Sequence, residues 1–203
     1  MRTRPALLGF IFAIGLTVAA IPSARAADPG TFELMGMRTG MTLPEVQRAV
    51  KQQKLGSPEL TRAPSFEQEV ALARKEPVKA TDYKGVQTLR AGNGDRRIQV
   101  FFVATPKGPV STKITIEVFD GTNTEELSET LISRYGLPTR KSDREWLWGD
   151  AGRFYARTKH YLEFQSRPVS ATGPKPTARM VLGDPALQKR LRKAISDEAR
   201  KTN

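Results

Sequence analysis

Apolar and polar residues follow a helical period early in the chain, within residues 40–58, GMTLPEVQRAVKQQKLGSP. Thr42 and Glu45 stand three positions apart, which is the spacing of a helix capping box. Gly56 and Pro58 predict the end of the helix, because glycine favours a left-handed C-terminal cap and proline cannot continue a helix. The apolar positions at helical spacing are Leu43, Val46 and Val50.

The same outline returns eighty positions later, within residues 121–138, GTNTEELSETLISRYGLP. Thr122 and Glu125 repeat the capping box, and Gly136 with Pro138 repeats the stop. The apolar stripe here consists of Leu127, Leu131 and Tyr135, with Tyr135 equivalent to Leu55 of the first segment. The apolar positions between the capping box and the stop do not align residue for residue in the two segments. We therefore predict a duplicated unit, with the alternative that both helices share only the cap and stop that any helix needs.

Short runs rich in β-branched and aromatic residues follow each of these helices and predict antiparallel strands. After the first helix they are residues 81–91, 96–105 and 112–120, and after the second they are residues 144–150, 153–159, 160–166 and 178–184. The pattern predicts an α+β fold of two tandem units, each with helices packed on an antiparallel sheet of three to four strands. The first unit is expected over residues 27–120 and the second over residues 121–203.

Two further helices are predicted. Ser65 and Gln68 form another capping box ahead of residues 66–75. Asp184 and Pro185 open a C-terminal helix whose narrow apolar stripe is surrounded by basic residues. Such a helix can lie on an anionic membrane or pack along a sheet edge, and the absence of aromatic residues from its stripe favours the sheet edge. The stripe consists of Leu187, Leu191 and Ile195, and the basic residues are Lys189, Arg190, Arg192 and Lys193.

The N-terminal segment predicts a cleaved signal peptide over residues 1–26. Arg2 and Arg4 precede an apolar run, and small residues at Ala24 and Ala26 mark a cleavage site. The alternative is an uncleaved anchor, but the run is shorter than a bilayer-spanning helix needs. The chain has no cysteine, so it offers no lipid-attachment thiol, disulfide or thiolate ligand. We expect a periplasmic or secreted protein with no transmembrane anchor after cleavage.

Charge narrows the choice of partner. The formal net charge is +12, and removal of residues 1–26 takes away three arginines and no acids, which leaves +9. In the cytoplasm this balance would suggest nucleic acid. An exported chain instead meets envelope proteins and anionic wall or lipid components, which are the partners we expect. The alternative is that the basic surface is merely solvated.

The chain lacks the residue sets that most enzyme chemistry needs. Its only histidine is His160, and zinc sites built on histidine and cysteine need several such ligands. No serine stands in a nucleophile elbow, and no glycine-rich loop leads into a helix. Asp143, Glu145 and Asp150 lie near the tryptophans, but strand alternation places the first two on the face opposite them. We predict no catalytic residue, no metal site and no cofactor.

Aromatic and basic residues are interleaved within residues 139–164, and this combination is typical of binding surfaces. Trp146 and Trp148 are two positions apart and so share one face of a strand. The alternative is that the aromatic face is the core of the second unit, which we favour for Trp148. The candidate binding residues are Arg144, Trp146, Arg153, Tyr155, Arg157 and Tyr161.

The stretch LMGMRTGMTLPEVQRAV, residues 34–50, resembles the opening of small bacterial envelope domains. These include the lipoprotein subunit of the outer-membrane β-barrel assembly machinery, and the repeated layout is similar to β-lactamase-inhibitor-like folds. The resemblance implies an envelope protein that binds another protein or the cell wall and catalyses nothing. The chain departs from the lipoprotein subunit in lacking the lipidated cysteine. Since only the start of the helix matches these domains, the resemblance assigns no binding residue to this chain.

We therefore expect an exported, non-enzymatic envelope protein that binds a protein partner as an assembly accessory or inhibitor-like module, through its basic aromatic second unit or a concave sheet surface. Two alternatives remain open: a soluble carrier or sensor for an anionic lipid or glycan, and a small hydrolase. A carrier requires an apolar cavity. Protein binding requires an exposed patch rimmed by charge, and a hydrolase requires two carboxylates that face each other.

Overall fold

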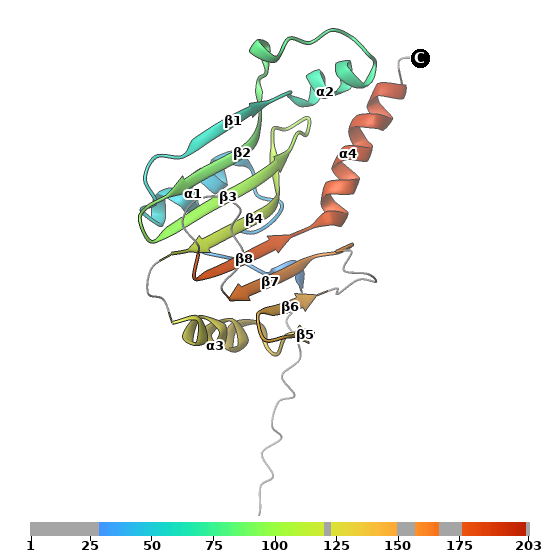
Figure 1. Ribbon diagram of the computed structural model, residues 1–203. Coiled ribbons are helices and arrows are strands. Elements are labelled where there is room, and N and C mark those ends of the chain that lie inside the picture. The colour runs from blue at the N-terminus through green and yellow to red at the C-terminus, as the bar shows by residue number, and fades with distance from the viewer. Residues whose placement is uncertain (1–28, 120–122, 150–156, 167–175, 202–203) are drawn as a thin grey trace, which may run out of the picture.

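A computed structural model describes residues 29–119, 123–149, 157–166 and 176–201 (Figure 1). The expected signal peptide, residues 1–26, lies outside the described residues. The helices are α1 (Leu43–Gln52), α2 (Phe66–Ala73), α3 (Thr124–Tyr135) and α4 (Pro185–Arg200). The strands are β1 (Glu59–Ala63), β2 (Gly85–Gly92), β3 (Arg96–Val103), β4 (Val110–Val118), β5 (Arg140–Lys141), β6 (Glu145–Gly149), β7 (Tyr161–Ser166) and β8 (Ala178–Gly183).

The fold is α+β, as predicted, but the strands form one sheet instead of two. The sheet has eight strands in the order β1-β2-β3-β4-β8-β7-β6-β5, and each neighbouring pair is antiparallel. The expectation of separate sheets of three to four strands is therefore corrected. β4 and β8 pair through six residues each, Lys113–Val118 with Ala178–Gly183. This pairing satisfies two strand edges that separate sheets would leave exposed.

Two rows of apolar side chains cross this sheet on one face. Each row passes from β2 through β4 and β8 to β6 without a polar interruption, and both belong to one buried core. The first row is Leu89, Val100, Ile114, Leu182, Leu162 and Trp148, and the second is Ala91, Ile98, Ile116, Met180, Phe164 and Trp146. Paired side chains on the same face stabilise a sheet, so the two halves of the chain share one hydrophobic core.

Helices α1 and α3 cover this apolar face. Val46 and Val50 of α1 and Leu131 of α3 are buried in the same core cluster as the rows. The predicted capping box of α1 is present, with Thr42 N donating to Glu45 Oε2 at 2.7 Å.

At α3 the predicted cap is wrong. The cap is Asn123, not Thr122, and its side-chain oxygen accepts from the Glu125 amide at 3.0 Å. Asparagine is among the strongest N-caps, and here it stands one position nearer the helix.

The ends of α1 and α3 differ more than the sequence repeat predicts. α3 ends at Tyr135 and Gly136 takes a left-handed φ of 77°, as expected. α1 instead ends at Gln52, and Lys54 adopts the left-handed conformation before Gly56 is reached. Leu55 is only 1% exposed, so the chain leaves the helix early and turns this side chain into the core.

Helices α2 and α4 pack against each other at one end of the sheet, as Figure 1 shows. Ile195 and Ala199 of α4 form a small buried cluster with Val70 of α2. Arg74, after α2, donates to the backbone oxygens of Glu198 at 3.1 Å and Ala199 at 3.3 Å. The prediction that α4 packs along a sheet edge is therefore wrong, because the helix contacts α2 and the central strands β3 and β4.

Strand positions agree closely with the apolar runs except at three places. The strand expected over residues 153–159 lies largely outside the described residues, and 157–159 are not in a strand. β1 and β5, the two edge strands, were not predicted. In the described part of the chain, no helix combines the length and apolar character needed to cross a bilayer.

The shared core leads to a prediction about the free energy of unfolding. Replacing Ile114, which is fully buried, with alanine should lower the free energy of unfolding by about 2–5 kcal/mol, because apolar contacts with both halves are lost and a cavity remains. The matched control is Thr115→Ala on the opposite face, expected to change stability by less than about 0.5 kcal/mol. Urea unfolding followed by circular dichroism measures both. Equal effects of the two substitutions would contradict a shared core across β4.

Candidate functional site

The structure separates the predicted binding residues. Arg153 and Tyr155 lie outside the described residues. Arg144 is exposed just before β6, and Trp146 lies on the sheet face that α3 covers. Tyr161 pairs with Gly149 and Gly183 on the opposite face of the sheet. The described candidates therefore do not form one continuous surface.

The two tryptophans share a face, as predicted from their spacing, and both contribute to the core. Trp148 is fully buried, which confirms its predicted role, and its indole N–H donates to the Gly136 carbonyl at 2.8 Å. Trp146 is half-buried, with its ring centroid 5.9 Å from that of Phe164. The Lys141 ammonium lies 4.0 Å from the centre of the Trp146 ring, a cation–π contact at the edge of the sheet.

On the opposite face, Arg157 is held between two carboxylates. Its guanidinium lies 3.1 Å from Glu145 and 3.1 Å from Glu163, and its side chain is only 13% exposed. Arg140 joins the same network at 2.7 Å from Glu145. Because both arginines are engaged by acids of their own sheet, this cluster offers little free charge to a partner.

Tyr161 is also held within the fold. Its ring lies over Gly183, where a Cβ atom would come within 2.6 Å of the ring, so only glycine allows this packing. Burial raises the pKa of the Tyr161 hydroxyl, nearby Glu163 raises the pKa further, and Arg157 opposes both. Tyr161 forms a small buried cluster with Leu147 and Val181 on this face.

His160 fixes three segments of the chain. Its Nε2 lies 2.6 Å from Thr39 Oγ1 and 3.2 Å from Asp184 Oδ2. Asp184 is buried and caps α4 by accepting from the Leu187 amide at 2.9 Å. A catalytic triad needs the nucleophile and the acid on different ring nitrogens, whereas here both contact the same one. The contacts give His160 a structural role between the N-terminal segment, β7 and α4.

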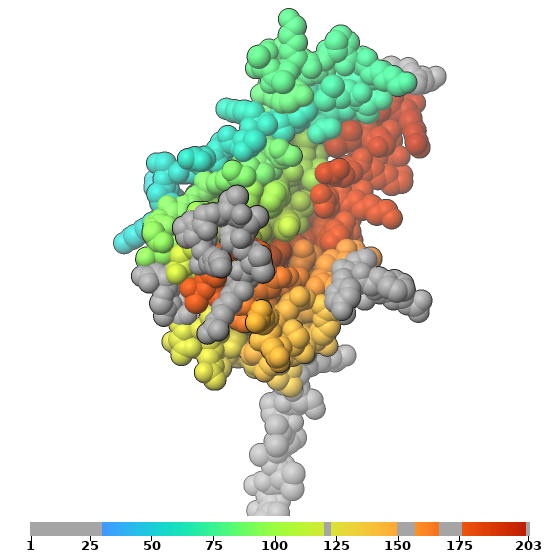
Figure 2. Space-filling view, in the orientation of Figure 1, coloured from blue at the N-terminus to red at the C-terminus, as the bar shows by residue number. Residues whose placement is uncertain are grey.

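A second surface emerges that the sequence reading did not single out. We call the outward side chains of β2, β3 and β4, together with Arg179 of β8, the open face. α1 lies behind the sheet in Figure 1, and Figure 2 shows atoms of β2–β4, in green, at the surface that faces the reader. Among the described helices, α4 reaches only the ends of β3 and β4 on this side. The open face consists of Arg90, Arg97, Gln99, Phe101, Lys113, Thr115, Glu117 and Arg179.

The basic side chains of the open face are held in place by their neighbours. Arg179 contacts Glu117 at 2.7 Å and Arg97 contacts the same carboxylate at 3.7 Å. The Arg97 guanidinium also lies 5.0 Å from the centre of the Phe119 ring, and the Lys113 ammonium lies 5.3 Å from that of Phe101. The open face therefore carries four cations and one carboxylate, with Arg90, Arg97 and Lys113 exposed, and a second carboxylate, Glu59 of β1, pairs with Arg90 at its margin.

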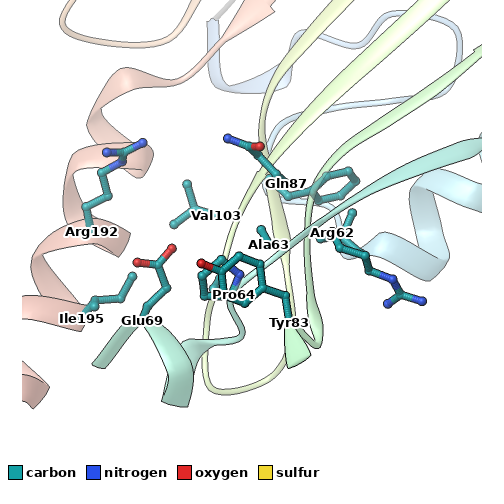
Figure 3. Close-up of a pocket in the computed structure, with 12 residues that line it drawn as sticks. Arg62, Ala63, Pro64, Glu69, Tyr83, Gln87, Val103, Arg192 and Ile195 are labelled. Carbon is teal, nitrogen blue, oxygen red and sulfur yellow. The ribbon is translucent and has the colours of Figure 1, made fainter. Parts of the chain in front are cut away.

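Figure 3 shows a pocket of about 250 Å³ where α2 and α4 meet the ends of β1, β2 and β3. Glu69 of α2 points into it, Arg192 of α4 lies on the opposite wall, and the guanidinium of Arg62 points away from it. Among the described residues, its lining holds a single carboxylate, so these residues do not form the pair of facing carboxylates that a glycoside hydrolase uses.

Comparison of the chain with protein-family models, with curated proteins and with solved structures gave no match.

The buried hydroxyl of Tyr161 predicts a pH dependence. Because its pKa in the folded protein is raised above the ordinary value near 10, the stability it contributes is complete below about pH 10 and is lost as pH rises through the folded-state pKa. We expect the free energy of unfolding to fall at alkaline pH, and less steeply in the Tyr161→Phe variant. Urea unfolding at a series of pH values tests this, and an unchanged slope in the variant would contradict it.

Proposed function

We propose that this is an exported, non-enzymatic envelope protein that binds an acidic partner protein through the open face. The observation that carries the proposal is an excess of positive charge on a sheet surface that no described helix covers at its centre. Four cations and one carboxylate lie on β2, β3, β4 and β8, and one further carboxylate, Glu59 of β1, lies opposite Arg90. Arginine and aromatic residues are enriched in protein interfaces, and ordered side chains lose less freedom on binding. The charge of the mature chain favours an acidic partner.

The open face replaces the second-unit cluster as the preferred binding surface. Arg140 and Arg157 are occupied by Glu145 and Glu163, whereas Arg90 and Lys113 of the open face are exposed and have no ion pair among the described residues. Charges that a partner can pair without first breaking an internal salt bridge contribute more to association. Arg144, which is exposed, remains a candidate at the rim.

The proposal includes the tandem organisation expected from the sequence. The order α1, β1, α2, β2–β4 is followed by α3, β5–β8, so both halves are a helix followed by four strands, with α2 inserted in the first. The strand order of the sheet runs outward from the β4–β8 pair in both halves. Leu55 and Tyr135, the equivalent positions of the two repeats, are both buried. These features support descent from one helix-plus-sheet unit, with a boundary near residue 120, and a function like that of envelope domains of this layout.

Photo-crosslinking in cells tests the proposed surface. A photoreactive residue at position 99 or 115, in the middle of the open face, should capture one and the same protein, because both positions face the partner. The comparison position is 129, on the exposed side of α3, where no capture of that protein is expected. Mass spectrometry identifies the captured molecule, and lipid or glycan adducts, or none, would overturn the proposal.

Charge reversal supplies the matched control. Arg90→Glu should abolish capture from position 115, because it places a carboxylate against the acidic partner. Arg48→Glu changes the charge equally on α1, on the other side of the sheet, and should leave capture intact. Equal loss in both variants would indicate a response to net charge alone and would contradict a localised interface.

A further inference from the structure

An apolar pocket of about 290 Å³ opens on the helical side of the sheet, where β4 meets β8. α3 forms one wall, and the segment before α1 forms another. Most of its lining is aliphatic or thioether side chain, contributed by Leu34, Met35, Ile116, Val118, Leu131 and Met180. The pocket therefore lies over the junction of the two halves and away from the open face.

The walls of this pocket are fixed by contacts between α3 and the N-terminal segment. The Tyr135 hydroxyl donates to the Glu33 carbonyl and accepts from the Glu33 amide. The rings of Phe32 and Tyr135 meet edge to face at 4.9 Å between centroids. A pocket held open by such contacts needs little ordering when a ligand binds, so more of the contact energy appears as affinity.

Two arginines stand at the rim. Arg96 pairs with Val118 in the sheet, so its side chain leaves the strand on the same face as the pocket. It is exposed and has no acidic partner among the described residues. Arg134 of α3 lies 3.3 Å from Glu33, and both side chains are partly exposed. Counted over the described residues, the rim therefore has two cations and one carboxylate, which leaves a positive charge for a ligand.

We propose that this pocket binds a single-chain amphiphile whose anionic head, a carboxylate or a phosphate monoester, is held by Arg96 and Arg134. The apolar lining buries the chain, and the guanidinium forks match the oxygen atoms of the head. The volume is just below the range of about 300–1,000 Å³ typical of ligand pockets, so it admits one chain and not two. A glycan is disfavoured because the described floor residues, Ile116, Val118 and Met180, carry no polar side-chain group to pair with its hydroxyls. This proposal is independent of the open face.

Isothermal titration calorimetry on the mature protein tests the ligand class with four probes of equal chain length, each below its micelle concentration. They are decanoate, decyl phosphate, decanol and decylammonium. Decanoate and decyl phosphate are expected to bind at least tenfold more tightly than decanol, with decylammonium weakest, because the rim is cationic. Preference for one anion over the other identifies the head group. Equal affinities for decanoate and decylammonium would overturn the proposal.

Two pairs of variants locate the site. Thr130 of α3 is exposed at the mouth, and Thr130→Trp should obstruct it and weaken decanoate binding more than tenfold. Glu129→Trp, at the next exposed position, does not line the pocket and should retain binding. Arg96→Gln should weaken decanoate binding about threefold to tenfold without affecting decanol, whereas Arg90→Gln on the open face should affect neither.

The remaining outcomes are equally decisive. If Thr130→Trp binds decanoate as tightly as the parent protein, the ligand lies elsewhere and the proposal is wrong. If no probe binds but the partner captured from the open face also crosslinks to position 130, the pocket accepts a side chain of that partner and not an amphiphile. Circular dichroism of each variant confirms that the fold is retained.

Discussion

The pairing of β4 with β8 is the contact on which the rest of the structure depends. Six residues of each strand are in register, and both apolar rows cross the sheet through this pair. Ile114 lies opposite Leu182 and Ile116 opposite Met180, so the core of one half continues into the core of the other. Without the pair, each half would be a four-stranded sheet with β4 or β8 as an unpaired edge strand, which is prone to association.

Both proposed binding surfaces are products of this pairing. On one side of the sheet it places Arg179 of β8 beside Glu117 of β4, which fixes the charge pattern of the open face. On the other side it places Met180 next to Ile116, which forms the floor of the apolar pocket. A face and a pocket that each combine residues from both halves exist only in the joined fold. Binding at either surface is therefore coupled to the integrity of the β4–β8 pair.

Local sequence signals predicted most of the helices and strands, because caps and alternation act over a few residues. The capping boxes at Thr42 and Ser65 and the start of α4 at Asp184 are present. β1 was missed because ELTRA has only one strongly apolar residue and lies at an edge, where one side of the strand meets solvent. The pairing of β4 with β8 joins residues sixty to seventy positions apart, and no local pattern specifies which strand edges meet.

The binding surface likewise could not be located from local sequence patterns alone. Spacing alone placed Trp146 and Trp148 on one face, but not which face the helices would cover. The sequence counts Arg157 and Arg90 as equal positive charges, whereas the fold pairs Arg157 with two carboxylates and leaves Arg90 exposed. A net charge of +12 therefore describes the whole chain without showing where a partner is attracted. That depends on which cations already have an ion pair. Glu145 and Glu163 contact Arg157, whereas Arg90 forms no ion pair among the described residues, although it pairs in the sheet with Glu59 of β1.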